Sequence, residues 1–382
     1  MLVEELAIAS RRAGRRGGRK GDRVPLAAVA ADDGVVHAGL VGERTVAASA
    51  VERIALHHPA EEITRRVGSH IGASSRFASG YSAQMLRRFS SLLVAAPLLL
   101  GCAGMRIRDA SDRVKVVEDV AYIPNDDDPK HRLDLYLPRD PGPHPVVLFV
   151  HGGFWRNQDR RYYQAFTGLY GNVGVALAKH GIAVAIPSYR LSPGVGIQDQ
   201  IADVLASLRW VEENIAQSGG DPTRIVLAGY SAGGHLVTLL TMEPIHMERA
   251  GLDPSRIKGC VSLSGILDVH AMELGQDHAF NEEVTYRLFG RSVNDQGRLS
   301  PSAYLRADAP PLLAFAAEHD YPFVLSAGEN AAARLGALGA KATFRVIPKI
   351  DHADMVLSIN SKDDHVSDAV AEFVHTVTVT AP

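Results

Sequence analysis

The sequence of 382 residues predicts an α/β domain in which a mostly parallel β-sheet carries helices on both faces. Short apolar runs such as 145–150 do not alternate with polar residues, as expected of strands buried on both faces of a parallel sheet. Longer helical segments separate these runs, so strand–helix units recur along the chain. A content of 46% hydrophobic and 22% charged residues is typical of a globular domain.

The individual elements follow from local pattern. Segments 114–123 and 132–137 alternate between apolar and polar residues around a turn-rich stretch, which predicts an antiparallel pair. Residues 267–308 interrupt the strand–helix alternation and are expected to pass over the strand ends. The further predicted strands are 145–150, 182–186, 224–228, 257–263, 311–317 and 342–347, and the predicted helices are 170–180, 197–217, 232–242, 326–338 and 364–377.

Charge and cysteine content exclude several functional classes. A formal net charge of -3 argues neither for a nucleic-acid-binding protein nor for a broadly basic membrane-surface protein. The two cysteines, Cys102 and Cys260, allow at most one disulfide, and no Cys/His spacing indicates a metal site. No predicted strand leads into Gly-x-Gly-x-x-Gly, which argues against a dinucleotide site. We therefore expect no metal, no cofactor and no nucleic-acid partner.

A secretory signal pattern lies inside the chain rather than at its start. Met85 precedes two arginines, an apolar run from Leu92 to Leu100, a glycine and Cys102. This order is that of a signal peptide, and the run is shorter than the roughly 20 residues of a membrane-spanning helix. Residues 99–102 resemble the lipobox of bacterial lipoproteins, which implies lipidation of Cys102. A buried helix of a larger fold is the alternative interpretation.

Residues 1–84 show no sustained helical or alternating pattern and contain a cluster of arginines and glycines. Our hypothesis is that translation starts at Met85 and that 1–84 are spurious, the alternative being a real, disordered basic extension. The expected organisation is an extension over 1–84, a signal peptide over 85–101, a linker over 102–112 and a folded domain over 113–382. A start at Met85 predicts a lipoprotein tethered in the bacterial cell envelope; otherwise we expect a cytoplasmic protein.

Residues 229–233 match Gly-x-Ser-x-Gly between a predicted strand and a predicted helix. A serine on such a sharp turn has strained dihedral angles, so its neighbours two residues away must lack side chains. Its hydroxyl then stands at a helix N-terminus, whose dipole favours developing negative charge. The pattern predicts Ser231 as a nucleophile.

Residues 151–155, His-Gly-Gly-Phe-Trp, follow the strand 145–150. Tetrahedral intermediates of acyl transfer require preorganised N–H donors, and consecutive glycines let the backbone approach the oxyanion. The predicted donors are the amides of Gly152, Gly153 and Ala232, whereas an ordinary Gly-Gly turn is the alternative. The aromatic residues predicted to wall the pocket are Phe154, Trp155 and Tyr230, although core packing explains Trp155 equally well.

A serine nucleophile needs an imidazole base and a carboxylate that orients it, in the chain order Ser, Asp or Glu, His. Asp320 lies just past the strand 311–317, and His352 lies in the loop after the strand 342–347. Glu318 and Asp268 are the competing acids. Of 16 histidines, His352 alone combines the right order with the right place, which His151, His365 and His375 do not.

Together these motifs resemble the α/β-hydrolase superfamily, and within it a branch of esterases and kynurenine formamidases. His151 to Trp155 look like the His-Gly-Gly-x-Trp signature of that branch, and residues 229–235 are similar to the elbow of feruloyl-esterase-like and prenylcysteine-methylesterase-like proteins. The resemblance covers about 114–377. It implies an α/β-hydrolase catalytic domain with Ser231, Asp320 and His352 as its triad and no cofactor.

The expected function is hydrolysis of small-molecule carboxylic esters through an acyl-enzyme, as in a serine carboxylesterase. One alternative is amide hydrolysis, by an arylformamidase or a peptidase. The other is a catalytically inactive binding protein that keeps the fold. The sequence does not indicate which acyl chain is preferred or which oligomeric state the protein adopts.

Overall fold

The computed structural model describes residues 112–379. The predicted extension over 1–84, the signal peptide over 85–101 and Cys102 lie outside the described residues.

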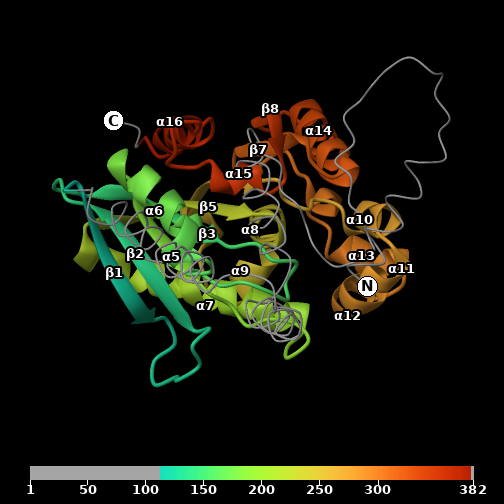
Figure 1. The fold of residues 1–382 in the computed structure, drawn as a ribbon, viewed down its shortest axis with the longest axis horizontal. Helices are drawn as coiled ribbons and strands as arrows, with labels where there is room; N and C mark the ends of the chain where they lie inside the picture. The colour runs from blue at the N-terminus through green and yellow to red at the C-terminus, as the bar shows by residue number, and fades with distance from the viewer. Residues whose placement is uncertain (1–111, 380–382) are drawn as a thin grey trace, which may run out of the picture. The chain divides into compact units, whose positions relative to one another are not determined.

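The described chain forms an eight-stranded sheet in the order β1-β2-β4-β3-β5-β6-β7-β8. The pairs β1–β2 and β2–β4 are antiparallel, and all pairs from β4 to β8 are parallel. The predicted fold class is confirmed, including the antiparallel pair at the start (Figure 1). The strands are β1 (Val114–Ala121), β2 (Arg132–Pro138), β3 (His144–Val150), β4 (Ala183–Pro187), β5 (Gly220–Tyr230), β6 (Ile257–Leu263), β7 (Leu312–His319) and β8 (Ala342–Asp351).

β8 extends four residues beyond its predicted end. An irregularity in its pairing with β7 lets Asp351 pair with His319, so the strand reaches the loop that begins at His352. α14 begins at Pro322 rather than at 326, because proline at the first helical position has no N–H to leave unpaired. α16 begins at Ser367, after Asp364 has accepted hydrogen bonds from the amides of Val366 and Ser367.

Helices cover both faces of the sheet. One apolar core contains α6 and α16 together with α15, and the other contains α7, α8 and α14. In Figure 1, α6 and α16 accordingly lie on one side of the strands and α7 on the other. The helices are α5 (Gln164–Thr167), α6 (Leu169–Lys179), α7 (Ile197–Asn214), α8 (Ala232–Met242), α9 (Ile245–Arg249), α10 (Val269–Gly275), α11 (His278–Phe280), α12 (Tyr286–Phe289), α13 (Val293–Arg298), α14 (Pro322–Ala337), α15 (Asp354–Leu357) and α16 (Ser367–Val377).

The predicted excursion over 267–308 folds as short helices. It contains α10 to α13, a π-helix over Asn281–Thr285 and a 3₁₀ turn over Pro301–Tyr304. Their packing connects this region to the segment after β3, since Phe280 lies against Phe154 with ring centroids 5.1 Å apart. The excursion therefore reaches the edge of the sheet where the predicted site residues lie.

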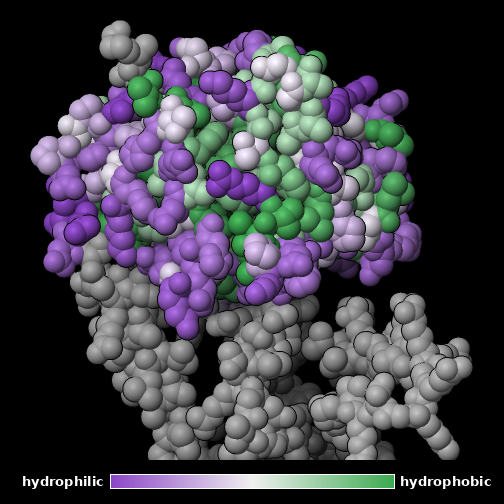
Figure 2. Space-filling view, turned by 90° about the horizontal axis from the view of Figure 1, so that it is seen from above, coloured by the Kyte–Doolittle hydropathy of each residue, from purple (hydrophilic) through white to green (hydrophobic). Residues whose placement is uncertain are grey.

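The surface mixes polar and apolar residues. Figure 2 shows a face on which hydrophobic residues gather between hydrophilic ones. Within 112–379, no helix combines the length and the apolar character that crossing a bilayer requires.

Candidate active site

Ser231 lies on the turn between β5 and α8. Its backbone has φ 53° and ψ -116°, a left-handed conformation that is unfavourable for a residue with a side chain. The surrounding glycines make the turn feasible. A Cβ at Gly229 would lie 2.5 Å from the backbone of Gly233, and a Cβ at Gly233 would overlap the carbonyl oxygen of Val150. The sequence pattern thus holds Ser231 at the N-terminus of α8, above the sheet.

The structure brings the three predicted triad residues together at the carboxyl ends of the parallel strands. His352 Nε2 lies 3.0 Å from Ser231 Oγ, and His352 Nδ1 lies 2.7 Å from Asp320 Oδ1. Both distances are hydrogen-bond lengths. Ser231 is buried, whereas the His352 side chain keeps 13% of its surface exposed. The imidazole therefore stands between a buried carboxylate and a hydroxyl, with access to solvent.

The carboxylate of Asp320 is held by four hydrogen bonds. Oδ1 accepts from His352 and from the amide of Tyr321 at 2.9 Å, and Oδ2 accepts from Ser264 Oγ and from the amide of Ala317 at 3.1 Å. Burial alone would raise the pKa of Asp320, but these hydrogen bonds and the nearby imidazole outweigh it and hold the pKa below its ordinary value. Asp320 is therefore ionised at neutral pH and oriented toward His352.

The competing acids lie elsewhere. Asp268 caps α10 by accepting from the amide of Ala271 at 3.0 Å. Glu318 is exposed and accepts from the amide of Lys349 at 2.7 Å. Neither carboxylate has a hydrogen bond to His352 among the described residues, so the geometry favours Asp320.

Two of the other histidines considered are engaged away from the nucleophile. His151 is fully buried, hydrogen-bonds the carbonyl of Gly152 at 2.8 Å and stacks on Tyr189. Burial lowers the pKa of His151 to about 3, so its imidazole stays neutral. His375 Nε2 hydrogen-bonds the carbonyl of His180 at 2.8 Å. His365 follows α15 and precedes α16.

The oxyanion prediction needs one correction. The amide of Gly152 donates to Tyr170 Oη at 3.0 Å, so it is engaged by the protein and we withdraw it as a donor. Within 112–379, the backbone hydrogen bonds of turns, loops and helix caps include none donated by the amides of Gly153 and Ala232. Gly153 adopts φ 105°, a conformation that favours glycine. These two amides remain the predicted oxyanion donors.

The three aromatic residues predicted as pocket walls differ in their surroundings. Trp155 is fully buried and packs edge-on against His235 and Phe289, so the pocket prediction for it is wrong and the core-packing interpretation holds. Phe154 is half-buried and contacts both Phe280 and Tyr321.

Tyr230 contacts the predicted base, His352. Its hydroxyl donates to the carbonyl of His352 at 2.8 Å, and the two rings lie 5.2 Å apart. Tyr230 also packs against the backbone after β3, since a Cβ on Gly152 would lie 2.8 Å from its Cδ1. It therefore contacts both the predicted base and the predicted oxyanion segment.

Sequence reasoning missed Ser264 and Tyr170. Ser264 is fully buried at the end of β6 and donates to Asp320, with its own backbone at φ 48°. A polar residue just past the strand beside β7 is the only sequence signal that could have pointed to it. Tyr170 lies on α6, and no spacing pattern in the sequence predicts its hydrogen bond with Gly152.

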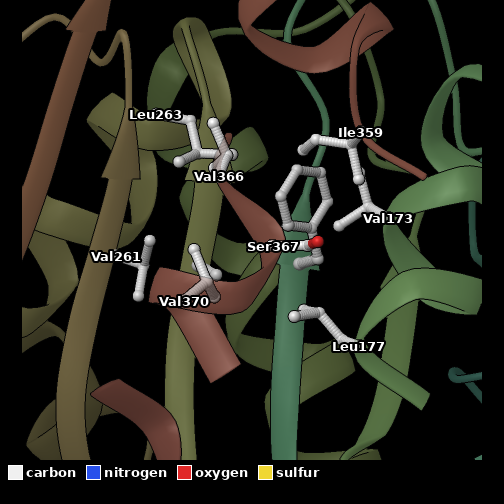
Figure 3. Close-up of a pocket in the computed structure, with 10 residues that line it drawn as sticks. Val173, Leu177, Val261, Leu263, Ile359, Val366, Ser367 and Val370 are labelled. Carbon is white, nitrogen blue, oxygen red and sulfur yellow. The ribbon is translucent and has the colours of Figure 1, made fainter. Parts of the chain in front are cut away.

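An apolar cavity between the sheet, α6 and α16 is not the substrate site. Its lining includes Val173, Leu177, Val261 and Val370 (Figure 3). It encloses about 10 Å³, which is room for at most one water molecule. Among the described residues, no group of three or more metal-ligating side chains is found.

Comparison with known proteins supports the same family. Residues 133–333, more than half of the chain, match the BD-FAE family model. A probable isoprenylcysteine alpha-carbonyl methylesterase of Oryza sativa subsp. japonica is 33% identical over 64% of this chain and 59% of its own length. Esterase LipQ of Mycobacterium tuberculosis is 30% identical over 67% of this chain and 61% of its own length. The chain thus spans about 60% of the length of these relatives.

Solved structures share the fold. A truncated carbohydrate esterase from gut microbiota superposes with a TM-score of 0.60 at 21% identity, covering 71% of this chain and 99% of that one. An inhibited esterase B from Lactobacillus rhamnosis superposes with a TM-score of 0.56 at 23% identity, covering 78% of this chain and 96% of that one. The resemblance inferred from the motifs is confirmed: the chain belongs to the BD-FAE family and has the α/β-hydrolase fold.

Proposed function

We propose that this protein is a serine carboxylesterase. The observation that carries the proposal is the continuous hydrogen-bonded path from Ser231 Oγ through His352 to Asp320, with distances of 3.0 Å and 2.7 Å. This arrangement activates a serine for attack on a carbonyl carbon. The names of the two relatives described above, a methylesterase and an esterase, support ester hydrolysis as the reaction class.

The proposed reaction proceeds in two halves. His352 Nε2 takes the proton of Ser231 Oγ as the oxygen attacks the ester carbonyl, and the resulting oxyanion accepts hydrogen bonds from the amides of Gly153 and Ala232. The intermediate collapses when His352 returns that proton to the leaving alkoxide, so the alcohol departs and an acyl-Ser231 ester remains. His352 then deprotonates a water molecule, which attacks the acyl carbon. Collapse releases the carboxylic acid and restores the serine hydroxyl.

Amide hydrolysis would use the same triad, so amide substrates must be assayed beside the esters. The full chain is assayed with short p-nitrophenyl esters, N-formylkynurenine and a peptide mixture. The proposal predicts turnover of the esters with the highest kcat/KM. Preferential turnover of N-formylkynurenine or of peptides would instead establish an amidase.

Ser231→Ala tests the nucleophile. We expect a loss of at least about 10³-fold in kcat with an unchanged Tm, because the hydroxyl makes no contact that the fold requires. A fluorophosphonate probe should add to the wild-type protein at Ser231 and not to the variant. Retained esterase activity in Ser231→Ala would refute the assignment, and a wild-type protein that neither reacts with the probe nor hydrolyses esters would indicate an inactive binding protein.

We also propose that the protein is tethered in the bacterial cell envelope through a lipidated Cys102, if translation begins at Met85. Metabolic labelling with a palmitate analogue should mark the wild-type protein and not Cys102→Ser. A peptide from residues 1–84 in the native protein would contradict the proposed start.

A further inference from the structure

The oxyanion loop, residues 151–158, adopts an unusual backbone conformation. Phe154, Trp155 and Gln158 have φ values of 51°, 59° and 75°, and Gly153 has φ 105°. Left-handed conformations of residues with side chains persist only where the surrounding structure holds them in place. The loop also carries the predicted Gly153 donor, so whatever holds the loop positions that amide.

One hydroxyl group connects both ends of this loop. Tyr170 Oη accepts from the amide of Gly152 at 3.0 Å and donates to Gln158 Oε1. The phenol oxygen thus accepts one hydrogen bond and donates another. These two bonds join Gly152 and Gln158 of the loop to Tyr170 of α6.

The surroundings fix the phenol in this bridging position. Tyr170 is fully buried, with its ring 6.1 Å from that of Phe149 and 5.8 Å from that of His151. Burial raises the pKa of Tyr170 above its ordinary value, so the hydroxyl keeps the proton that it donates to Gln158. The backbone of Gln158 is also held, because its main-chain carbonyl oxygen accepts a hydrogen bond from Lys130 Nζ at 2.8 Å.

The contact is transmitted to the rest of the site. The Gly152 amide donates to Tyr170 Oη, a Cβ on Gly152 would lie 2.8 Å from Cδ1 of the Tyr230 ring, and the Tyr230 hydroxyl donates to the carbonyl of His352. The Gly152–Gly153 peptide therefore has little room to move. Its own N–H is the Gly153 donor, which must be within hydrogen-bond distance of the oxyanion.

We propose that Tyr170 is a positioning residue of the active site: its hydroxyl, bridging Gly152 and Gln158, sets the orientation of the Gly153 amide toward the oxyanion. The inference rests on the proposed ester hydrolysis. Loss of the Tyr170 hydroxyl would let the Gly153 amide move away from the oxyanion. The oxyanion forms only in the transition state, so this loss should lower kcat rather than raise KM.

The test compares Tyr170→Phe with Tyr122→Phe in the full chain, using a short p-nitrophenyl ester. Tyr122 is also buried, and its hydroxyl donates to the carbonyls of Ser188 and Lys130, outside the oxyanion loop. We expect Tyr170→Phe to lower kcat by about 10- to 100-fold with KM changed less than about twofold. Tyr122→Phe should lower the Tm to a similar extent and change kcat by less than about twofold.

Gln158→Met gives an independent readout if Tyr170→Phe folds poorly. It removes the acceptor while keeping the length of the side chain, so kcat should fall as in Tyr170→Phe. The double variant should lose no more than the worse single variant, because both changes break one bridge. Additive losses, equal losses in Tyr122→Phe, or a kcat that rises in Tyr170→Phe would overturn the proposal. A rise would mean that the phenol competes with the oxyanion for Gly152.

The outcome for Tyr170 is separable from the proposed function. Absence of esterase activity in the wild-type protein contradicts the function itself. An active wild-type protein with an unaffected Tyr170→Phe variant contradicts only the positioning role.

Discussion

Replacing Asp320 with asparagine removes the charge beside His352 at nearly constant volume. The carboxylate lies 2.7 Å from the imidazole, and two unit charges at that separation attract by about 6 kcal/mol at an effective dielectric constant of about 20. An asparagine oxygen still accepts the hydrogen bond from Nδ1, so only part of this energy is lost. We expect kcat to fall about 10³- to 10⁴-fold, which corresponds to about 4 to 5.5 kcal/mol of transition-state stabilisation.

The same substitution should weaken the fold. Both oxygens of Asp320 accept from backbone amides, Oδ1 from Tyr321 and Oδ2 from Ala317. Whichever way the asparagine is turned, its NH₂ group meets one of these donors, and an unsatisfied buried donor costs about 1–3 kcal/mol. The Tm at neutral pH should therefore fall.

The loss of stability in Asp320→Asn should depend on pH in one direction. Because the folded-state pKa of Asp320 is lowered, its carboxylate stabilises the fold above the unfolded-state pKa of about 3.9. That contribution disappears as the pH falls through the folded-state pKa. The Tm difference between the wild-type protein and Asp320→Asn should accordingly shrink in acid.

The assay is steady-state hydrolysis of a p-nitrophenyl ester, with two matched controls. Glu318→Gln changes the exposed neighbouring acid, and Asp268→Asn changes the cap of α10, where asparagine also caps well. Both should retain kcat within about threefold. A large loss in either control, with near-normal kcat in Asp320→Asn, would refute the assignment of the orienting acid.

Three further variants test the supports of the site. Tyr230→Phe removes the hydroxyl that donates to the carbonyl of His352, so kcat should fall about 3- to 10-fold; an unchanged kcat would contradict this positioning role. Ser264→Ala removes one donor to Asp320 and should lower kcat by less than about 10-fold while raising the pKa of Asp320, which NMR titration of the carboxyl measures. Gly233→Ala places a Cβ against the carbonyl oxygens of Val150 and His151; a cost of about 3 kcal/mol should lower the Tm by about 6–12 °C, and a normal Tm would show that the turn can relax.

The fold and the triad were accessible from sequence because both depend on strand ends. Ser231, Asp320 and His352 each follow a recognisable strand, and the carboxyl ends of parallel strands meet at one edge of a sheet. Backbone geometry thus positions these residues, and the pattern of apolar runs predicts that geometry.

The remaining features depend on side-chain contacts between distant segments. Gly152 was assigned to the oxyanion hole because nothing in the spacing indicates that Tyr170 engages its amide. Trp155 follows the same glycines, yet its ring packs into the core against Phe289. The short helices α10 to α13, of three to seven residues, are below the length at which helical periodicity becomes visible.

The position of β8 at the edge of the sheet has a consequence for thermal inactivation. Among the strands of residues 112–379, β5, which precedes Ser231, lies between β3 and β6, whereas β8, which precedes His352, pairs with β7 on one side only. Edge elements open in local fluctuations that leave central strands intact. Hydrolysis should therefore cease on heating while most of the backbone is still protected from hydrogen exchange, and it should return on cooling.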